Sequence, residues 1–319
     1  MKELSLTIDY SDFDSFERTI SLLRDENFDL IKITINTTKK LERIELKRII
    51  KAEDSFNTTV FQNIIVLPFC LFVNHSYLRN LRRYHIKLLF DLDTAEKYSS
   101  IVIKKKLKKL KRKKIESAVR IKEVSGGIKG TIDNLNFGNV KYYFENVDYS
   151  NECIEYFRQW IFDKKAPYIN FFDDIINNVL LKTVINDCSH SSCLGKELYL
   201  SKDKVFSFCR IYPSKTILAN LSDINNLNDV FEQRNLLSII KNSINKRNIC
   251  LNDCKYYDVC KGGCPLLSSE KCNEKNFVAL YNEISETMLA IIKSDNLDIY
   301  NIHIRNAILK YIVFENTNI

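Results

Sequence analysis

The sequence predicts an α/β protein built on a parallel sheet. Through the first 165 residues, short stretches typical of strands are followed by stretches whose apolar residues recur at three- and four-residue steps. Strands that alternate with helices favour a parallel sheet with right-handed crossovers. Periodicity alone fits an open Rossmann-like sheet as well as a partial barrel. With 319 residues and a 45% hydrophobic composition, the chain can bury a sizeable core and has room for two domains.

Six strands are expected in this region. The first rests on Leu4, Leu6 and Ile8, which alternate with polar residues as in a strand with one buried face. The six expected strands cover residues 4–8, 30–35, 60–67, 86–92, 118–124 and 140–145.

Helical spacing follows most of these strands. In the first helix Phe16, Ile20 and Leu23 recur at helical steps, and Asp14 is the expected cap at its start. Further helices are expected over 41–50, 77–84, 94–115, 153–162, 171–185, 277–292 and 299–314.

The cysteines are concentrated in one part of the chain. Eight of the ten fall between positions 188 and 272. Four of them form the pattern Cys-x3-Cys-x5-Cys-x3-Cys at positions 250, 254, 260 and 264, where Gly262 and Gly263 permit a tight bend before Cys264. Thiolates grouped this closely suit a soft metal or an iron–sulfur cluster, because the thiolate is the ligand. The other two cysteines, Cys70 and Cys153, are expected to be buried as small apolar residues.

Three interpretations of this group compete. Disulfides are disfavoured, because the chain opens without a secretory signal and has no apolar stretch long enough to span a bilayer. We therefore expect a cytoplasmic protein without a membrane span. Two zinc sites of four thiolates each and two [4Fe–4S] clusters both fit the spacing.

The cysteine pattern, with Gly-Gly-Cys-Pro at its end, closely resembles the SPASM domain, the auxiliary-cluster domain of radical SAM peptide maturases. The pattern departs from the family's in its first gap, which has three residues instead of two, and in its short final gap before Cys272. Lys204 also stands where the family has glycine. The resemblance implies two fully ligated [4Fe–4S] clusters, with two structural zinc ions as the alternative. It assigns one cluster to Cys188, Cys193, Cys209 and Cys264, and the other to Cys250, Cys254, Cys260 and Cys272.

The first half of the chain lacks the motifs that bind S-adenosylmethionine in this family. A radical SAM enzyme carries Cys-x3-Cys-x2-Cys after its first strand, whereas this chain reads Ile8-Asp9-Tyr10-Ser11-Asp12-Phe13-Asp14 there. The family's Gly-Gly-Glu after the second strand is also missing, and Ile35-Asn36-Thr37-Thr38 stands there. The chain therefore resembles a pseudo-radical-SAM protein with a SPASM domain, of the kind associated with Bacteroidales-type or grasp-with-spasm peptide maturation systems. We expect it to bind no S-adenosylmethionine and not to act as a radical SAM enzyme.

This resemblance sets the expected architecture. It implies a partial (β/α)6 radical-SAM-like barrel over residues 1–165, a small Cys-rich SPASM domain over 166–275, and C-terminal helices over 276–319 that pack on the barrel.

A basic segment is the second marked feature of the sequence. Nine of the eleven residues from 104 to 114 are Lys or Arg. The net charge of the chain is +8, so the residues outside this segment carry a net charge of about −1. Leucines at helical spacing predict an amphipathic helix with a solvated outer face. The same charge also suits docking of an acidic leader peptide or partner protein, whereas no nucleic-acid-binding pattern accompanies it. The candidate partner-binding residues are Lys104, Lys105, Lys108, Lys109, Lys111 and Arg112.

Three functions are compatible with these features. The first is an accessory factor that presents a ribosomally made precursor peptide to a partner maturation enzyme, of radical SAM or ATP-grasp type. The second is an iron–sulfur protein that exchanges electrons with a radical SAM enzyme, and the third is a non-radical peptide-modifying enzyme. No catalytic residue is identifiable from the sequence.

Overall fold

A computed structural model describes most of the chain. The described residues are 3–24, 26, 28–53, 60–68, 75–83, 86–92, 105, 108–112, 117–121, 127–135, 141–144, 149–183, 185, 196–210, 213–260, 275–294 and 296–317. They form two compact units, the first from residues 1–91, 108–117 and 192–245, and the second from 92–107, 118–191 and 246–319.

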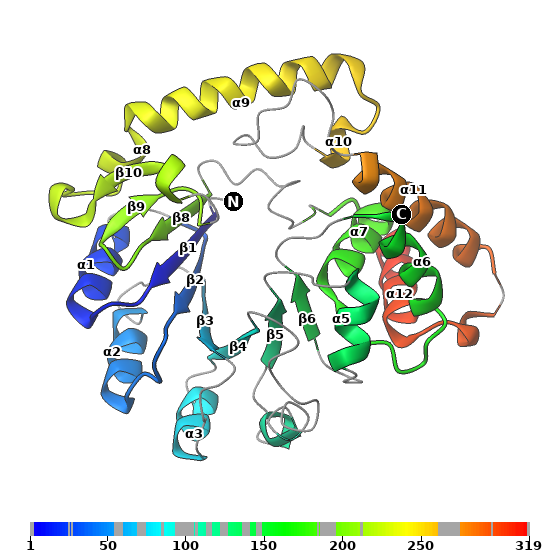
Figure 1. Cartoon of the computed structure of the whole chain (residues 1–319), viewed down its shortest axis with the longest axis horizontal. Coiled ribbons are helices and arrows are strands. Elements are labelled where there is room, and N and C mark those ends of the chain that lie inside the picture. The colour runs from blue at the N-terminus through cyan, green and yellow to red at the C-terminus, as the bar shows by residue number, and fades with distance from the viewer. Residues whose placement is uncertain are drawn as a thin grey trace. The chain divides into compact units, whose positions relative to one another are not determined.

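The first unit is organised on a mainly parallel sheet with strand order β10-β9-β8-β1-β2-β3-β4 (Figure 1). Strand β1 pairs in parallel with β2, placing Leu6 opposite Ile33, and β2 pairs in parallel with β3. On its other side β1 pairs in parallel with β8, which is distant in sequence. The strands are β1 (Glu3–Asp9), β2 (Leu30–Asn36), β3 (Val60–Pro68), β4 (Lys87–Leu92), β8 (Glu197–Leu200), β9 (Val205–Ser207) and β10 (Ile217–Asn220).

Alternating side chains give this sheet one apolar and one polar face. In β1, Leu4, Leu6 and Ile8 are buried, and in β2 Ile31, Ile33 and Ile35 are fully buried. Ser5, Thr7 and Asp9 lie on the opposite face of β1, because successive side chains of a strand point to opposite sides. The helices of this unit are α1 (Phe13–Arg24), α2 (Arg43–Glu53), α3 (His75–Arg83), α8 (Asn228–Phe231) and the first half of α9 (Arg234–Asp253).

In its described residues, the second unit has three parallel strands and an aromatic core. The strands, in sheet order, are β5 (Ser117–Ile121), β6 (Lys141–Phe144) and β7 (Tyr168–Ile169). Trp160, Phe157 and Phe172 pack together with ring centroids 5.2–6.2 Å apart, and the Trp160 indole N–H donates to the Pro167 carbonyl at 2.8 Å. The helices are α5 (Gly127–Leu135), α6 (Asn151–Trp160), α7 (Asn170–Leu181), α10 (Tyr257–Cys260), α11 (Lys275–Ile292) and α12 (Ile302–Thr317).

The structure confirms the predicted fold class and the six predicted strands, each with shifted bounds. Of the helix predicted over 94–115, residues 105 and 108–112 are helical, and the other positions lie outside the described residues. The assignment of Asp14 as the first helix cap was wrong: α1 begins at Phe13, and Asp12 Oδ1 accepts the Ser15 N–H at 2.7 Å. Within the described ranges, no helix is long and apolar enough to cross a membrane.

Several elements were not predicted from the sequence. They are α5, the short edge strand β7, the β8–β9–β10 group with α8 and α9, and the short helix α10. The predicted ranges 1–165, 166–275 and 276–319 remain a prediction about domains, although β8, which lies in the second range, pairs with β1 of the first.

Candidate functional site

Polar side chains meet where β1 and β2 end, on the polar face of the first unit's sheet. Asp9 and Asn36 are the last residues of the two strands and stand opposite each other. The Asn36 side-chain amide donates to Asp9 Oδ1 at 2.8 Å, and the Tyr199 hydroxyl from β8 donates to Asp9 Oδ2 at 2.5 Å. Burial, together with the bond to Asp9, raises the pKa of Tyr199, so this hydroxyl keeps its proton at neutral pH. Both carboxylate oxygens of Asp9 therefore accept hydrogen bonds from within the protein.

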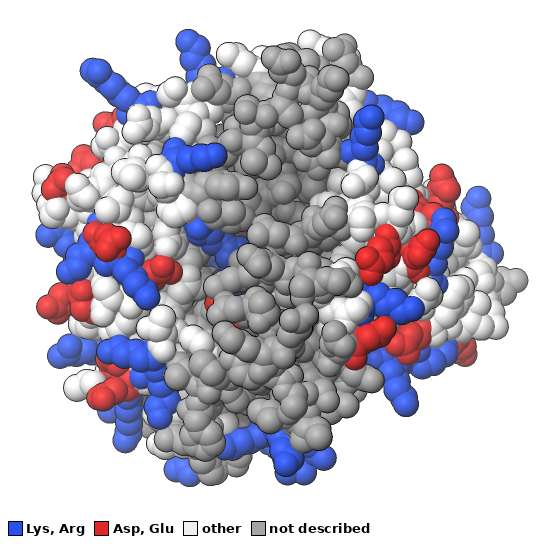
Figure 2. Space-filling model, viewed as in Figure 1, with Lys and Arg blue, Asp and Glu red and all other residues white. Residues whose placement is uncertain are grey.

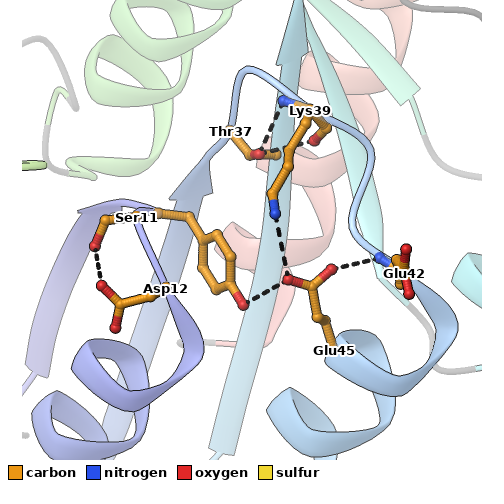
Figure 3. A network of polar contacts seen from close by, with 7 residues as sticks. Ser11, Asp12, Thr37, Lys39, Glu42 and Glu45 are labelled. Carbon is orange, nitrogen blue, oxygen red and sulfur yellow. Dashed lines mark hydrogen bonds and ion pairs between the residues drawn. The ribbon is translucent and has the colours of Figure 1, made fainter.

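A second polar network lies beside this one, on the residues that follow β1 and β2 (Figure 3). The Tyr10 hydroxyl donates to Glu45 Oε1 at 3.0 Å, and Lys39 Nζ approaches the same oxygen at 3.8 Å. The other oxygen, Oε2, accepts the Glu42 N–H at 2.6 Å, which is the capping-box contact at the start of α2. Burial and the contact with Glu45 raise the pKa of Tyr10. Glu45 is thus a shared acceptor that ties the end of β1 to α2.

The connection from β1 to α1 is only three residues long, Tyr10 to Asp12. Its last residue caps α1 and also pairs with Lys204 Nζ at 3.2 Å from Oδ2. Partial burial would raise the pKa of Asp12, but the hydrogen bonds from Ser15, Ser11 and Lys204 outweigh it and hold the pKa below its usual range. Lys204 lies in the turn from β8 to β9 with φ of +63°, in the left-handed region that favours glycine. The resemblance placed a family glycine at this position, and its backbone geometry explains that preference.

The cysteines of the second predicted cluster lie partly within the described residues. Cys250 is in the last turn of α9, and its carbonyl accepts the Cys254 N–H at 2.9 Å, so the two residues are one turn apart. Both carry free thiols, and Cys260 is buried at the end of α10. Cys272 lies outside the described residues. Of the first predicted cluster, Cys209 is buried after β9, whereas Cys188, Cys193 and Cys264 are not described.

The chemistry of these side chains suits a metal or iron–sulfur centre bound by thiolates. Each predicted set offers four cysteines, so no oxygen or nitrogen ligand is required. Over the described part of the chain, no three His, Cys, Asp or Glu side chains come together in a group that could hold a metal ion. Since each predicted set has at least one member outside that part, both ligand sets stay predictions.

The basic segment is described at five of its six predicted contact residues, and Lys104 is not described. Leu110 is buried, whereas Lys108, Lys111 and Arg112 are exposed, as expected for an amphipathic helix. Lys105 is exposed and Lys109 is half-buried. On the face in Figure 2, the described basic side chains are interspersed with acidic ones.

The contacts that Asp9 and Asp12 make, and the partners in those contacts, were not predicted from the sequence. Asn36 was identifiable in principle, because the carboxyl ends of neighbouring parallel strands lie at one edge of a sheet. Tyr199 was not identifiable, since its position depends on the pairing of β8 with β1 across 190 residues.

Comparisons with known proteins support the fold. No protein-family model matches this chain, and a search of curated proteins finds no match. Among solved structures, a histidine-tagged form of anSMEcpe with bound AdoMet has a TM-score of 0.69 at 15% identity, over 97% of this chain and 98% of that chain. Native anSMEcpe with bound AdoMet and Kp18Cys peptide has a TM-score of 0.68 at 15% identity, over 90% and 97%. Streptococcus suis SuiB bound to S-adenosylmethionine has a TM-score of 0.53 at 14% identity, over 82% and 71%. At these identities the likeness establishes a radical SAM fold and nothing about activity.

Proposed function

We propose that this chain is an accessory factor for the maturation of a ribosomally made peptide, which it presents to a partner modifying enzyme without cleaving S-adenosylmethionine. The observation that carries this proposal is the three-residue connection between β1 and α1. It contains no cysteine, and its Asp12 is engaged as a helix cap and as an ion-pair partner. In a radical SAM fold this is the segment from which the resemblance expects three cysteine ligands.

The strand ends beside this connection support the same conclusion. Asn36 lies in the segment where the resemblance expects the Gly-Gly-Glu motif. Its side-chain amide donates to Asp9, and its carbonyl accepts the Tyr10 N–H at 2.9 Å. Thr37 N–H donates to the Val66 carbonyl at 3.0 Å, and the Thr37 hydroxyl donates to the Lys39 carbonyl at 2.7 Å. The polar groups of this edge therefore bond to one another.

The proposal that the partner is a peptide is supported by solved structures with a similar fold. Two of them contain the bound peptides Kp18Cys and Cp18Cys. We place the two [4Fe–4S] clusters on the two cysteine sets given above, with Cys250, Cys254 and Cys260 contributed by the segment around α10. A fully thiolate-ligated cluster supplies electron transfer or a rigid cross-link, and has no open iron for substrate. Thiolate ligands persist in a reducing compartment, so we place the protein in the cytoplasm.

The test uses protein purified without oxygen. We expect about eight irons and eight sulfides per chain, as two four-iron clusters require, no heat of binding with S-adenosylmethionine, and no 5′-deoxyadenosine under reducing conditions. Saturable binding of S-adenosylmethionine or its cleavage would overturn the proposal. In a coupled assay, the precursor peptide should be modified faster by the partner enzyme when this chain is added.

A redox-silent form of the protein separates presentation from electron transfer. Protein reconstituted with zinc should bind the peptide and still accelerate its modification if the chain acts by presentation. Retained folding with complete loss of acceleration would indicate an electron carrier. A change in peptide mass with this chain alone would indicate an enzyme.

A further inference from the structure

A groove of about 960 Å³ lies within the second unit, at the start of β6 and β7. On the side of the strands, the groove is lined by Lys141 and Tyr168, which are paired with each other across β6 and β7. Helix α7 contributes Asp173 and Leu181, and α12 forms the other wall. The groove lies at the amino ends of these strands, whereas the candidate site lies at the carboxyl ends of strands in the first unit.

The wall formed by α12 is apolar on its outer side. Ile304, Ala307 and Ile308 of α12 are buried, and α12 packs against α7. Leu309 and Val313 nevertheless leave 55% and 62% of their surface exposed, and Phe314 leaves 44%. A helix that is apolar on both sides usually has a second contact partner, because large exposed apolar groups favour burial.

The floor of the groove is held in place by ring contacts. His303 stacks on Trp160 with centroids 5.5 Å apart and interacts with the Ala166 carbonyl at 3.0 Å. Tyr168 packs edge-on against His303 at 5.9 Å. Burial lowers the pKa of His303, which favours the neutral ring at pH 7. This floor is therefore packed by aromatic contacts, and its imidazole is favoured in the neutral form.

The rim of the groove is basic. Lys141 and Lys310 are exposed. Asp173 is the one carboxylate among the lining residues that the structure describes, and it already accepts the Tyr168 hydroxyl at 3.2 Å and the Asn177 amide at 3.0 Å. Lys141 Nζ lies 5.8 Å from the centre of the Tyr168 ring. With Asp173 counted, the described lining residues keep a net positive charge beside the apolar wall, and acidic groups of an occupant complement this charge.

We infer that this groove docks a peptide segment in which Asp or Glu residues flank large apolar side chains. The apolar side chains would cover Leu309, Val313 and Phe314, and the carboxylates would pair with Lys141 and Lys310. The inference rests on the proposed function only for the natural source of the segment, which would be the precursor peptide. It places peptide docking on residues of the second unit, whereas residues 108–112 of the basic segment and the strand ends of the candidate site belong to the first unit.

The test is a selection of displayed random dodecapeptides on the intact protein, followed by affinity measurements with the enriched peptides. We expect enrichment of acidic and large apolar residues. Leu309→Asp should weaken binding about tenfold, because it puts a carboxylate into the apolar wall. Lys310→Glu should weaken it by roughly threefold, with less salt dependence than the wild type.

Leu289→Asp is the matched control, since Leu289 is 54% exposed on α11 and does not line the groove. It should change affinity by less than about twofold, as expected for a surface position without a partner. Equal losses in both variants, no enrichment, or enriched peptides without acidic residues would overturn the inference. So would a dimer that Leu309→Asp converts to monomer, because the groove would then be an interface between copies. None of these results depends on clusters or S-adenosylmethionine, so failure here is distinguishable from failure of the proposed function.

Discussion

Lys204 occupies a left-handed backbone position while its side chain pairs with Asp12. For a residue with a Cβ atom, this conformation costs about 1 kcal/mol of conformational free energy. The ion pair is worth at most about 1 kcal/mol, because the two side chains are 52% and 42% exposed. We expect Lys204→Gly to be more stable than Lys204→Ala by about 1 kcal/mol, since both variants lose the ammonium group and only glycine relieves the backbone. Denaturant unfolding of the two variants measures the difference, and equal midpoints would contradict the positive φ.

Asp12 makes a second prediction at the residue scale. Asp12→Ala removes the acceptor for the Ser15 N–H and should destabilise the protein by about 1 kcal/mol, whereas Asp12→Asn keeps a capping oxygen and should cost less. The pKa of Asp12 is depressed in the folded protein, so the stability that its charge contributes is present above its ordinary value of 3.8. The gap between wild type and Asp12→Asn should therefore shrink as the pH falls below that value toward the folded pKa. A gap that widens in acid would show that the carboxylate is not stabilised by its contacts.

At the element scale, the helical part of the basic segment can be tested as a docking surface. Lys108, Lys111 and Arg112 are exposed around the buried Leu110, so reversing these three charges to Glu should leave the fold intact. If the segment attracts an acidic peptide, the triple variant should bind it more weakly at low salt, and the difference should fade as salt is added. Unchanged binding at low salt would assign the segment to a solvated face.

The segment around α10 carries the prediction about metal. Cys260 and Cys153 are both buried, with 6% and 1% of their surface exposed, so Ala replaces a similar small side chain in each. Cys260→Ala should lower the iron content by about half, since one of two clusters loses a ligand. Cys153→Ala should leave it unchanged and serves as the control. Equal iron in both variants would remove Cys260 from the ligand set.

Elements with strong periodicity were predictable from the sequence, and those defined by tertiary contacts were not. Leu4, Leu6 and Ile8 alternate with other residues in the sequence, and this pattern identified β1. The three side chains are buried on one face of the strand, as the pattern predicts. Strand β7 has two residues, too few to show a period, and α5 contains Gly127 and Gly130, which weaken a helical signal. The site followed the same rule. The position of Asp9 at the end of a strand could be predicted from the sequence. Tyr199 contacts Asp9 because β8 pairs with β1, and that pairing could not be predicted.

At the scale of the whole molecule, the pairing of β8 with β1 affects how the chain acquires its structure during synthesis. Strand β1 is synthesised before β8, so one of its edges lacks its final neighbour until residues 197–200 have emerged from the ribosome. Nearly two hundred residues must be synthesised in between, and an apolar strand with an open edge is prone to pair with other chains. A fragment that stops at residue 165 should therefore aggregate when expressed alone, and supplying residues 192–245 separately should improve its recovery. The order of translation thus sets a period of vulnerability for this protein, during which a chaperone or early peptide binding would have its greatest effect.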